Sequence, residues 1–229
     1  MSENNKQSST SPLLLGATRG SWLMPVNHGT ELDTNKKLVA VRDKILKRDN
    51  YTCKYCGWHS ERHQEIHHIN HNHKDFRESN LATVCPLCHQ VFHLSSASIT
   101  EGAEIIWLPE MTQEDLNRLC IAIFIAEKSG NKKWEGPAKR LFNALNSRAE
   151  FVNNSLSDKA SDPGVFAETL LNLSKEEYKG REKFVKNLRL LPFSSRFLTQ
   201  IEYWSAACFK DIPLDDWLTI IPKEFNENK

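Results

Sequence analysis

The segments Cys53-Lys54-Tyr55-Cys56 and Cys85-Pro86-Leu87-Cys88-His89 decide how this chain folds. Each contains a Cys-x-x-Cys pair, and residues 57–84, 28 in all, separate the two pairs. Two residues between the cysteines allow one turn to present both sulfurs to a single ion, and two such pairs complete a tetrahedral site. Because four protein ligands leave no open position for water, we predict a structural zinc held by Cys53, Cys56, Cys85 and Cys88.

The backbone around the cysteine pairs carries two further signals. Gly57 directly follows the first pair and supplies the conformational freedom that such a turn requires. Residues 90–94 follow the second pair, and we expect a short helix there whose N-terminus directs amide groups at the thiolates. The alternative, four unrelated core cysteines, does not account for the repeated spacing.

Composition limits the kind of protein. The chain has 229 residues, 39% of them hydrophobic, which suits one domain of above-average size or two small ones. A formal net charge of +1 argues against a dedicated nucleic-acid-binding protein, which is usually far more basic. No apolar run approaches the ~20 residues of a membrane span, so we expect no direct membrane insertion. Paired cysteines without a secretory signal favour a reducing compartment, and we expect a cytoplasmic protein.

Apolar residues at helical spacing predict that the second half of the chain is helical. A short strand is expected before it, at residues 104–108. We expect six helices. The first lies between Thr112 and Gly130, the second spans residues 137–152, and the third follows Asp162-Pro163. The fourth lies between Ser174 and Pro192, the fifth carries the apolar stripe Phe197, Ile201, Trp204 and Cys208, and the last begins at Asp215. The predicted fold class is therefore α+β, mainly α-helical with a small zinc-binding region.

The sequence also predicts a helix cap and two buried thiols in the helical half. The helix after Ser174 opens with a capping-box pattern. Its apolar face is formed by Phe184, Val185, Leu188 and Leu191. Cys120 and Cys208 lie on apolar stripes, so we interpret both as buried thiols rather than nucleophiles.

The predicted domain layout has three parts. Residues 1–12 are polar and are expected to form a disordered tail. Residues 13–100 form the zinc-binding region, whose first apolar residues should pack on a neighbouring element. Residues 101–229 form a helical region packed on it, and the two regions make one compact unit.

A basic helix is expected at residues 33–50, with Asp33 or Thr34 as its cap. Residues 36–49 carry six basic against two acidic side chains, a local balance of +4. One interpretation is a solvated helix face, and the other is a surface for phosphate or for an acidic protein segment.

Histidines gather between and beside the cysteine pairs. Eight of the nine fall within residues 53–93. Residues 65–69 alternate like a strand, so His67 and His68 should point to opposite faces and do different jobs. Plain surface positions are expected for His59, His63, His71 and His73.

In this arrangement the sequence resembles the HNH endonuclease family. The matching elements are Arg48-Asp49-Asn50-Tyr51-x-Cys53-x-x-Cys56-Gly57, Glu65-Ile66-His67-His68-Ile69, Asn80-Leu81 and Cys85-x-x-Cys88-His89. The resemblance covers about residues 42–94 and implies an HNH-like ββα region, a zinc-bound strand hairpin followed by a helix. The segment 70–77 departs from the glycine-containing loop of many members.

The HNH resemblance also implies chemistry. His68 would be the general base that activates water, and Asn80 would fix the loop that orients it. His67 and His89 would hold a second divalent ion, which stabilises charge on the leaving oxygen. The alternative is that the HNH scaffold is kept for its fold while the nuclease activity is lost.

Along nearly its whole length, including Leu14-Leu15-Gly16-Ala17-Thr18-Arg19-Gly20-Ser21-Trp22, the chain also resembles the IcmJ (DotN) family. These are soluble subunits of the coupling complex of bacterial Dot/Icm type IV secretion systems. The resemblance implies binding to the C-terminal tail of a DotL-like coupling ATPase, together with IcmS- and IcmW-like adaptor proteins that receive effector substrates. It also implies association with the inner membrane through that complex.

Three functions are therefore weighed. The favoured one is a zinc-stabilised adaptor that is not an enzyme. The second is a metal-dependent HNH nuclease using His67, His68, Asn80 and His89. The third is a zinc module that binds nucleic acid without cutting it, which the near-zero net charge disfavours.

Overall fold

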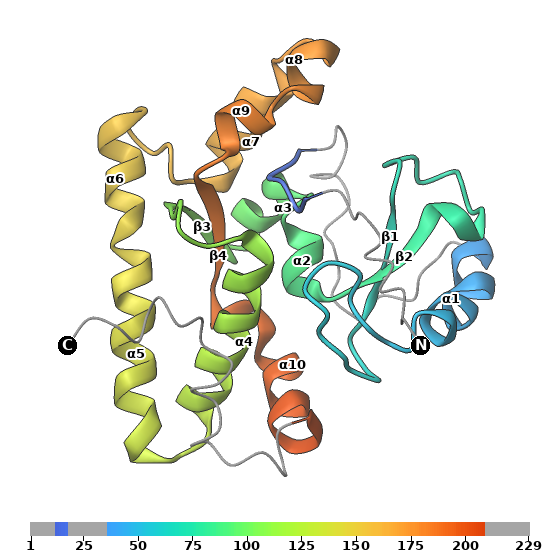
Figure 1. The fold of residues 1–229 in the computed structure, drawn as a ribbon, viewed down its shortest axis with the longest axis horizontal. Coiled ribbons are helices and arrows are strands. Elements are labelled where there is room, and N and C mark those ends of the chain that lie inside the picture. Colours follow the sequence, from blue (N-terminus) through green and yellow to red (C-terminus); the bar gives the residue numbers. More distant parts are fainter. Residues whose placement is uncertain (1–11, 18–35, 209–229) are drawn as a thin grey trace, which may run out of the picture.

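The chain folds into two neighbouring groups of elements (Figure 1). The structure, a computed structural model, describes residues 12–17 and 36–208. Some sequence predictions concern parts that are not described: the tail before residue 12, the caps Asp33 and Thr34, the thiol of Cys208, and the helix at Asp215. Within the described residues the fold class is as predicted, α+β and mainly helical, with a small ββα region that gathers the four cysteines.

The first group surrounds a short antiparallel hairpin. Its elements are α1 (Lys36–Arg48), β1 (Glu65–His68), the 3-10 turn η1 (Glu78–Asn80), β2 (Leu81–Val84) and α2 (Pro86–Gln90). The next helix, α3 (Leu94–Ile99), packs mainly on the second group. Glu65 pairs with Val84, and His68 pairs with Leu81. Helix α1 packs on this hairpin through a small apolar cluster of Ile45, Leu46, Ile66 and Leu81.

The basic side chains of α1 hold the helix to the hairpin. Arg48 donates to the carbonyls of Glu78 and Leu81 at 2.7 and 2.8 Å, and it also pairs with Asp49. Arg42 donates to the backbone just before β1 at 2.6 Å. The basic helix is present as predicted, but Arg42 and Arg48 donate hydrogen bonds to the backbone around the hairpin and so do not form a free solvated face.

The second group is built on another antiparallel pair. Its elements are β3 (Ala103–Trp107), α4 (Gln113–Lys128), α5 (Lys132–Asn146), α6 (Arg148–Ser155), α7 (Pro163–Leu171), α8 (Lys175–Lys179), α9 (Glu182–Val185), β4 (Leu188–Pro192), η2 (Ser194–Phe197), α10 (Leu198–Tyr203) and the π-helical turn η3 (Trp204–Cys208). Ala103 pairs with Pro192, and Trp107 pairs with Leu188. Helix α6 packs on β3 and α4 packs on β4 (Figure 1).

Helix α4 is the centre of the hydrophobic core. The Thr112 hydroxyl caps it by accepting from the N–H of Asp115 at 3.1 Å. Residues 119–126 are all buried, including Cys120, so the predicted central helix and its core thiol are confirmed. One continuous apolar cluster joins this helix to the four cysteines and to Phe197, Ile201 and Trp204. The two groups therefore share a core.

The helix predicted from Ser174 to Pro192 is wrong in its second half. The capping box at Ser174 is present, but α8 and α9 are short and β4 replaces the rest. Leu188 and Leu191 are spaced three apart, which suits a helix as well as an irregular strand. Pairing with β3 supplies hydrogen bonds and burial that the local pattern does not contain, and this tertiary pairing decides the outcome.

The helix predicted at residues 137–152 is also divided differently. Helix α5 already begins at Lys132, behind the cap Asn131, and Pro137 lies inside it. Helix α5 ends at Asn146, and α6 starts at Arg148 after the single residue Ser147. The strand predicted at residues 104–108 is confirmed as β3, shifted by one residue.

Residues 12–17 lie between the two groups as an extended strap. The N–H of Gly16 donates to the carbonyl of Val91, just after α2, at 2.9 Å. From the second group, Arg181 donates to the carbonyl of Leu15 at 2.9 Å. The apolar side chains of the strap are buried, as predicted: Leu13, Leu15 and Ala17.

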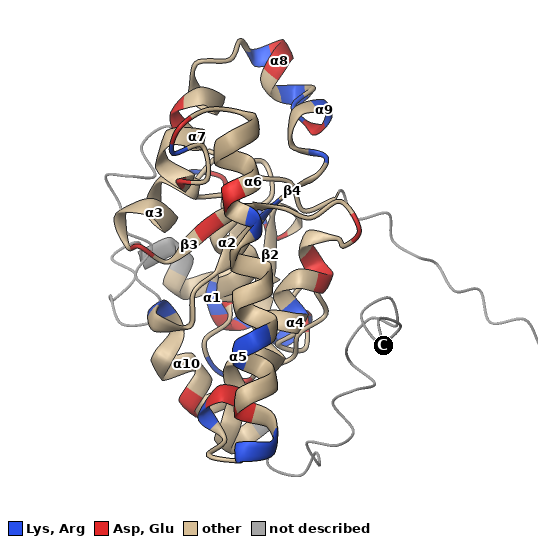
Figure 2. Cartoon of the chain, turned by 90° about the vertical axis from the view of Figure 1, so that its left-hand side faces the viewer, with Lys and Arg blue, Asp and Glu red and all other residues tan. Residues whose placement is uncertain are grey.

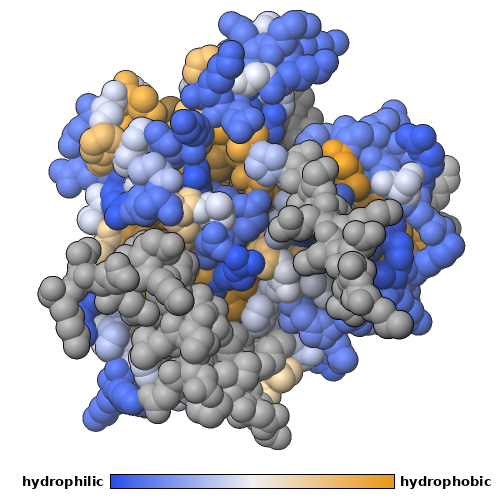
Figure 3. Space-filling view, in the orientation of Figure 1, coloured by the Kyte–Doolittle hydropathy of each residue, from blue (hydrophilic) through white to orange (hydrophobic). Residues whose placement is uncertain are grey.

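The surface mixes charges and a few apolar side chains. Acidic and basic residues are interspersed on α5, α8 and α9 (Figure 2). Phe151 of α6 and Leu156, the residue after α6, are 51% and 59% exposed, and hydrophobic side chains reach the surface over this part of the molecule (Figure 3). Among the described residues, no helix combines the length and the apolar character needed to cross a membrane.

Candidate metal centres

The four predicted zinc ligands come together in a buried cluster. The sulfurs of Cys53, Cys56, Cys85 and Cys88 all lie within 4.8 Å of one another. The Sγ atoms of Cys56 and Cys85 are 3.6 Å apart. A disulfide requires about 2.05 Å, whereas two sulfurs on one tetrahedral zinc lie about 3.8 Å apart, given a Zn–S distance of ~2.3 Å. The spacing therefore fits a four-coordinate metal ion, and the cysteines can hold one.

Two different backbone devices present these sulfurs. The first pair lies on a tight turn, where the N–H of Gly57 donates to the carbonyl of Cys53 at 3.0 Å. Gly57 has a φ of +73°, and a Cβ there would meet nothing within 4 Å. Glycine is therefore favoured at this position by the left-handed backbone and not by lack of space.

The second pair lies at the start of α2, and here the predicted helix position is wrong. The helix spans Pro86–Gln90, not residues 90–94, and Cys85 is its N-cap. Pro86 occupies the first helical position, where a backbone N–H would have no partner within the helix. Proline, which lacks this N–H, therefore favours a helix that starts directly after Cys85. The N–H of Cys88 donates to the Cys85 sulfur at 3.4 Å, so the helix end faces the thiolates as expected.

Helix α4 supports the cysteine cluster from the second group. Asn117, fully buried, donates from Nδ2 to the Cys88 sulfur at 3.2 Å. Its Oδ1 accepts from Gln113 at 3.0 Å, and Gln113 exchanges two hydrogen bonds with the backbone of Leu190 in β4. Arg118 donates to the carbonyl of Cys56 at 2.9 Å. The sequence prediction missed these partners, although Gln113 and Asn117 are polar residues four apart on an apolar helix.

Burial and mutual hydrogen bonding set the acidity of the thiols. Burial opposes ionisation of Cys53, but hydrogen bonds from the other three cysteines outweigh it and hold its pKa well below the ordinary value. Burial raises the pKa of Cys85 and Cys88 well above it. Cys85 and Cys88 are therefore neutral, and a metal ion must displace their protons when it binds.

A second centre is formed by histidines. The ligand nitrogens of His67, His89 and His93 lie within 4.8 Å of one another, and all three residues are at most 9% exposed. The Nε2 atoms of His89 and His93 are 3.3 Å apart. This equals the separation of about 3.3 Å expected for two imidazoles on one tetrahedral metal with a metal–nitrogen distance of ~2.05 Å. The sequence placed His67 and His89 at this centre but missed His93.

Two residues hold these imidazoles in place. The Glu65 carboxylate accepts from Nδ1 of His89, which leaves Nε2 of that ring free to face His93. This carboxylate–imidazole arrangement orients many metal-binding histidines. The His67 ring stacks on Phe92 with centroids 4.2 Å apart and planes 14° from parallel. The triad is therefore fixed from β1 and from the turn after α2.

His68 lies beside the triad in a different environment. Its ring centroid lies 5.0 Å from that of His73 and 5.5 Å from that of Phe76, and its Nε2 is buried with no hydrogen-bond partner among the described residues. Asn80 contacts the loop that follows His68, and its Oδ1 accepts from the N–H of Asn70 at 3.0 Å. Its Nδ2 donates to the carbonyl of Asp75 at 2.9 Å. Asn80 thus ties the loop to β2.

The remaining histidines fall into two groups. His59 and His63 lie away from the triad, where His59 is exposed and His63 packs edge-on against Tyr203 at 5.5 Å. His71 and His73 are also exposed, yet their rings reach the histidine centre. His71 lies 5.2 Å from His67, and His73 lies 6.4 Å from His93.

Burial keeps the imidazoles of His67 and His93 neutral. It lowers the pKa of His67 and His93 well below the ordinary value, and the neighbouring His89 ring lowers both further. Burial likewise lowers the pKa of His68 to about 4, with His73 as the next cause. Neutral imidazoles offer the lone pairs that a metal ion needs.

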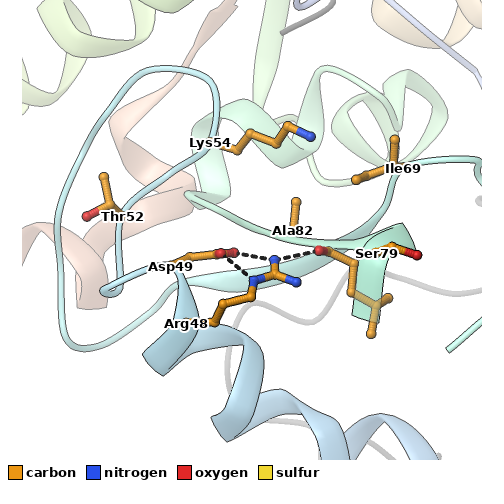
Figure 4. A pocket seen from close by; sticks show the side chains of 8 residues that line it. Arg48, Asp49, Thr52, Lys54, Ile69, Ser79 and Ala82 are labelled. Atoms are coloured by element: carbon orange, nitrogen blue, oxygen red, sulfur yellow. Dashed lines mark hydrogen bonds and ion pairs between the residues drawn. The ribbon is translucent and has the colours of Figure 1, made fainter. Parts of the chain in front are cut away.

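A surface pocket of about 490 Å³ lies beside α1 and β2, and neither metal centre lines it. Figure 4 shows Arg48 at its floor, pointing toward Asp49. Because Arg48 is already paired with Asp49 and with two backbone carbonyls, its guanidinium group stabilises the fold. Lys54 extends over the opposite wall (Figure 4).

Comparison with known proteins places this geometry in a class. The HNH endonuclease family model matches residues 53–93, which contain both metal centres. The chain thus carries an HNH-type region inside a larger, mainly helical protein.

A relative also matches the rest of the chain. The type 4 apparatus protein DotN of Legionella pneumophila is 32% identical over 202 residues, which cover 87% of this chain and 92% of DotN. The chain belongs to the DotN (IcmJ) family.

Proposed function

We propose that this protein is an adaptor subunit of a type IV secretion coupling complex. It binds the C-terminal tail of a DotL-like coupling ATPase and helps to recruit effector substrates. The observation that carries this proposal is the extent of the likeness to DotN. It spans 87% of the chain, including the helical half, whereas the HNH match ends at residue 93.

The cysteine cluster has a structural role in this proposal. Four buried sulfurs at tetrahedral spacing suit zinc, and a site with four protein ligands has no position for a reacting water. The contacts from Asn117 and Arg118 make the ion part of the core that both groups of elements share. Zinc therefore stabilises the surface that meets the partner.

The partners and the location follow from the same proposal. IcmS- and IcmW-like adaptor proteins are further partners within the complex and receive effector substrates. The protein itself stays cytoplasmic and is held at the inner membrane through the coupling ATPase. It has no need to insert into the bilayer.

Co-purification from cells tests the adaptor role. An affinity-tagged copy, expressed in its own bacterium, is expected to retain the coupling ATPase, and deletion of the ATPase tail should abolish that retention. His68→Ala serves as the matched variant, because it changes the HNH chemistry without touching the cysteines. Equal retention of full-length and tail-deleted ATPase would exclude the proposed contact.

A second candidate function, metal-dependent nuclease, is favoured by one specific observation. The triad His67, His89 and His93 is arranged for a metal, and His68 offers an unpartnered imidazole nitrogen beside it. In this role His68 would take a proton from the attacking water, and His67, His89 and His93 would hold a divalent ion that supplies charge stabilisation at the leaving oxygen. Incubation of supercoiled plasmid with magnesium, manganese or nickel tests it. Absence of cleavage, or cleavage that persists in His68→Ala, removes this candidate.

A further inference from the structure

The strap is hydrogen-bonded to the turn between α2 and α3. The N–H of Gly16 donates to the carbonyl of Val91 at 2.9 Å, and the carbonyl of Gly16 accepts from the N–H of Leu94 at 3.2 Å. Phe92 and His93 lie between these two points in the chain. The strap therefore holds the backbone of the turn on both sides of these two residues.

Both residues of this turn belong to the histidine centre. The Phe92 ring stacks on His67 with centroids 4.2 Å apart, and Nε2 of His93 lies 3.3 Å from Nε2 of His89. Phe92 and His93 are 6% and 4% exposed, so neither ring can move without repacking its neighbours. A shift of the turn would therefore change the spacing of the metal-binding triad.

His93 depends on its backbone more than the other ligand on this side of the centre does. His89 is oriented by the carboxylate of Glu65, whereas the buried Nδ1 of His93 has no hydrogen-bond partner among the described residues. Helices α2 and α3, on either side of this turn, have five and six residues. Helices this short are not stable by themselves, so contacts from outside must fix the turn between them.

Two side chains of the second group hold the strap in turn. The hydroxyl of Tyr178, in α8, accepts from the N–H of Ala17 at 3.1 Å and donates to the carbonyl of the same residue at 2.9 Å. Arg181 donates from Nε to the carbonyl of Leu15 at 2.9 Å, and its guanidinium lies 4.4 Å from the centre of the Tyr178 ring. This cation–π contact joins the two side chains into one clamp.

Glycine at position 16 lets the clamp and the turn approach closely. A Cβ at Gly16 would lie 3.2 Å from the hydroxyl oxygen of Tyr178 and 3.7 Å from the Cα of Phe92. The strap is thus packed between the second group and the turn with no room for a larger side chain. A displacement of Tyr178 would reach the turn through a single residue.

We propose that Tyr178 and Arg181 are positioning residues of the histidine centre and act on it through the strap. They hold Gly16 against the turn, and the turn holds Phe92 and His93 where the triad can share one divalent ion. The inference rests on the triad binding a metal ion and is independent of the adaptor role.

The connection has a thermodynamic consequence. If a firmly held strap favours metal binding at the triad, then metal binding must tighten the hold on the strap by the same factor. The helical half and the histidine centre would thus influence each other across the boundary between the two groups of elements.

Cobalt binding to the intact protein tests the positioning role. The cysteine centre is first filled with zinc, and Co²⁺ is then titrated while its visible spectrum is recorded. Tyr178→Phe removes both hydrogen bonds to Ala17. It should bind Co²⁺ about threefold to tenfold more weakly than wild type, less than the loss of a direct outer-sphere partner causes.

Tyr203→Phe is the matched control and should bind Co²⁺ like wild type. Tyr203 is a half-buried tyrosine of α10 that contacts Arg62 and His63, away from the strap. Circular dichroism establishes that both variants are folded. A merely structural role of Tyr178 would lower the melting temperature and leave the Co²⁺ affinity of the folded protein unchanged.

Amide hydrogen exchange of wild type, followed by mass spectrometry, is a second measurement that needs no variant. The N–H groups of Gly16 and Ala17 should exchange more slowly once Co²⁺ fills the histidine centre. The proposal is overturned if their exchange is the same with and without Co²⁺, or if folded Tyr178→Phe binds Co²⁺ like wild type. It is also overturned if wild type takes up no metal beyond the cysteine centre. None of these outcomes bears on retention of the coupling ATPase, so the two proposals fail separately.

Discussion

At the scale of single residues, the protein places two kinds of metal-binding side chain within one short region. The cysteines are packed into the core, and one of them is held by an asparagine from another helix. The histidines belong to the same region, and burial together with the neighbouring His89 ring keeps His67 and His93 neutral. Removing single ligands separates the contributions of the two centres.

Cys88→Ser is expected to abolish metal binding at the cysteine centre and to give poorly folded or insoluble protein. Structural zinc contributes its binding free energy directly to folding, so losing one ligand removes most of that contribution. Metal content per chain and yield of soluble protein are the measurements. Cys120→Ser, at a buried thiol outside the cluster, is the control and should keep its metal. Fully soluble, stable Cys88→Ser protein without metal would contradict the structural role.

The acid sensitivity of the fold should depend on His68. In the unfolded chain an imidazole has a pKa near 6.5, while burial lowers the pKa of His68 to about 4. Between these values the unfolded state binds more protons, so the free energy of unfolding falls as the pH falls from about 6.5 toward 4.

His68→Gln removes this titration and should show a smaller loss of melting temperature between pH 7 and pH 5 than wild type does. Thermal unfolding followed by circular dichroism measures it. His59→Gln, at an exposed imidazole outside the centre, should keep the wild-type dependence. Identical pH profiles for wild type and His68→Gln would show that His68 is not buried as described.

At the scale of secondary-structure elements, α4 connects the cysteine centre to the second sheet. A line of buried hydrogen bonds runs from Cys88 through Asn117 and Gln113 to Leu190 in β4. Buried polar groups of this kind stabilise a fold only while every member is paired. Asn117, at the centre of this line of hydrogen bonds, is therefore the residue whose substitution should lower the stability of the fold most.

Asn117→Ala should lower the free energy of unfolding by about 1–3 kcal/mol, because Gln113 and the Cys88 sulfur each lose a buried partner. Urea unfolding at constant zinc content measures the change. Asn143→Ala, on the exposed face of α5, should cost far less. Similar free energies for the two variants would mean that the line of hydrogen bonds does not support the core.

Elements differ in how far the sequence predicts them. The cysteine spacing and the apolar stripe of α4 are local signals: the first correctly predicted that the four sulfurs come together, and the second correctly predicted a central helix. The strand β4 was predicted as helix because its partner β3 lies more than 80 residues earlier in the chain. His93 was missed because its relation to His89 depends on the turn after α2, which was itself predicted as part of a helix.

At the scale of the whole molecule, the HNH-type region is not an independent unit in its packing. The apolar cluster runs from the cysteines into α4 and α10, and the strap of residues 12–17 bonds to both groups of elements. In the proposed adaptor role, a partner that binds the helical half would meet a surface whose stability depends on the cysteine centre. Metal binding at the cysteines would then support partner binding without any chemical step.

Titration calorimetry between the purified, zinc-loaded protein and the C-terminal tail of its coupling ATPase tests the adaptor role most directly. We predict association at micromolar concentration or tighter, with the same affinity for wild type and for His68→Ala. No association between the pure components at micromolar concentration would contradict the account.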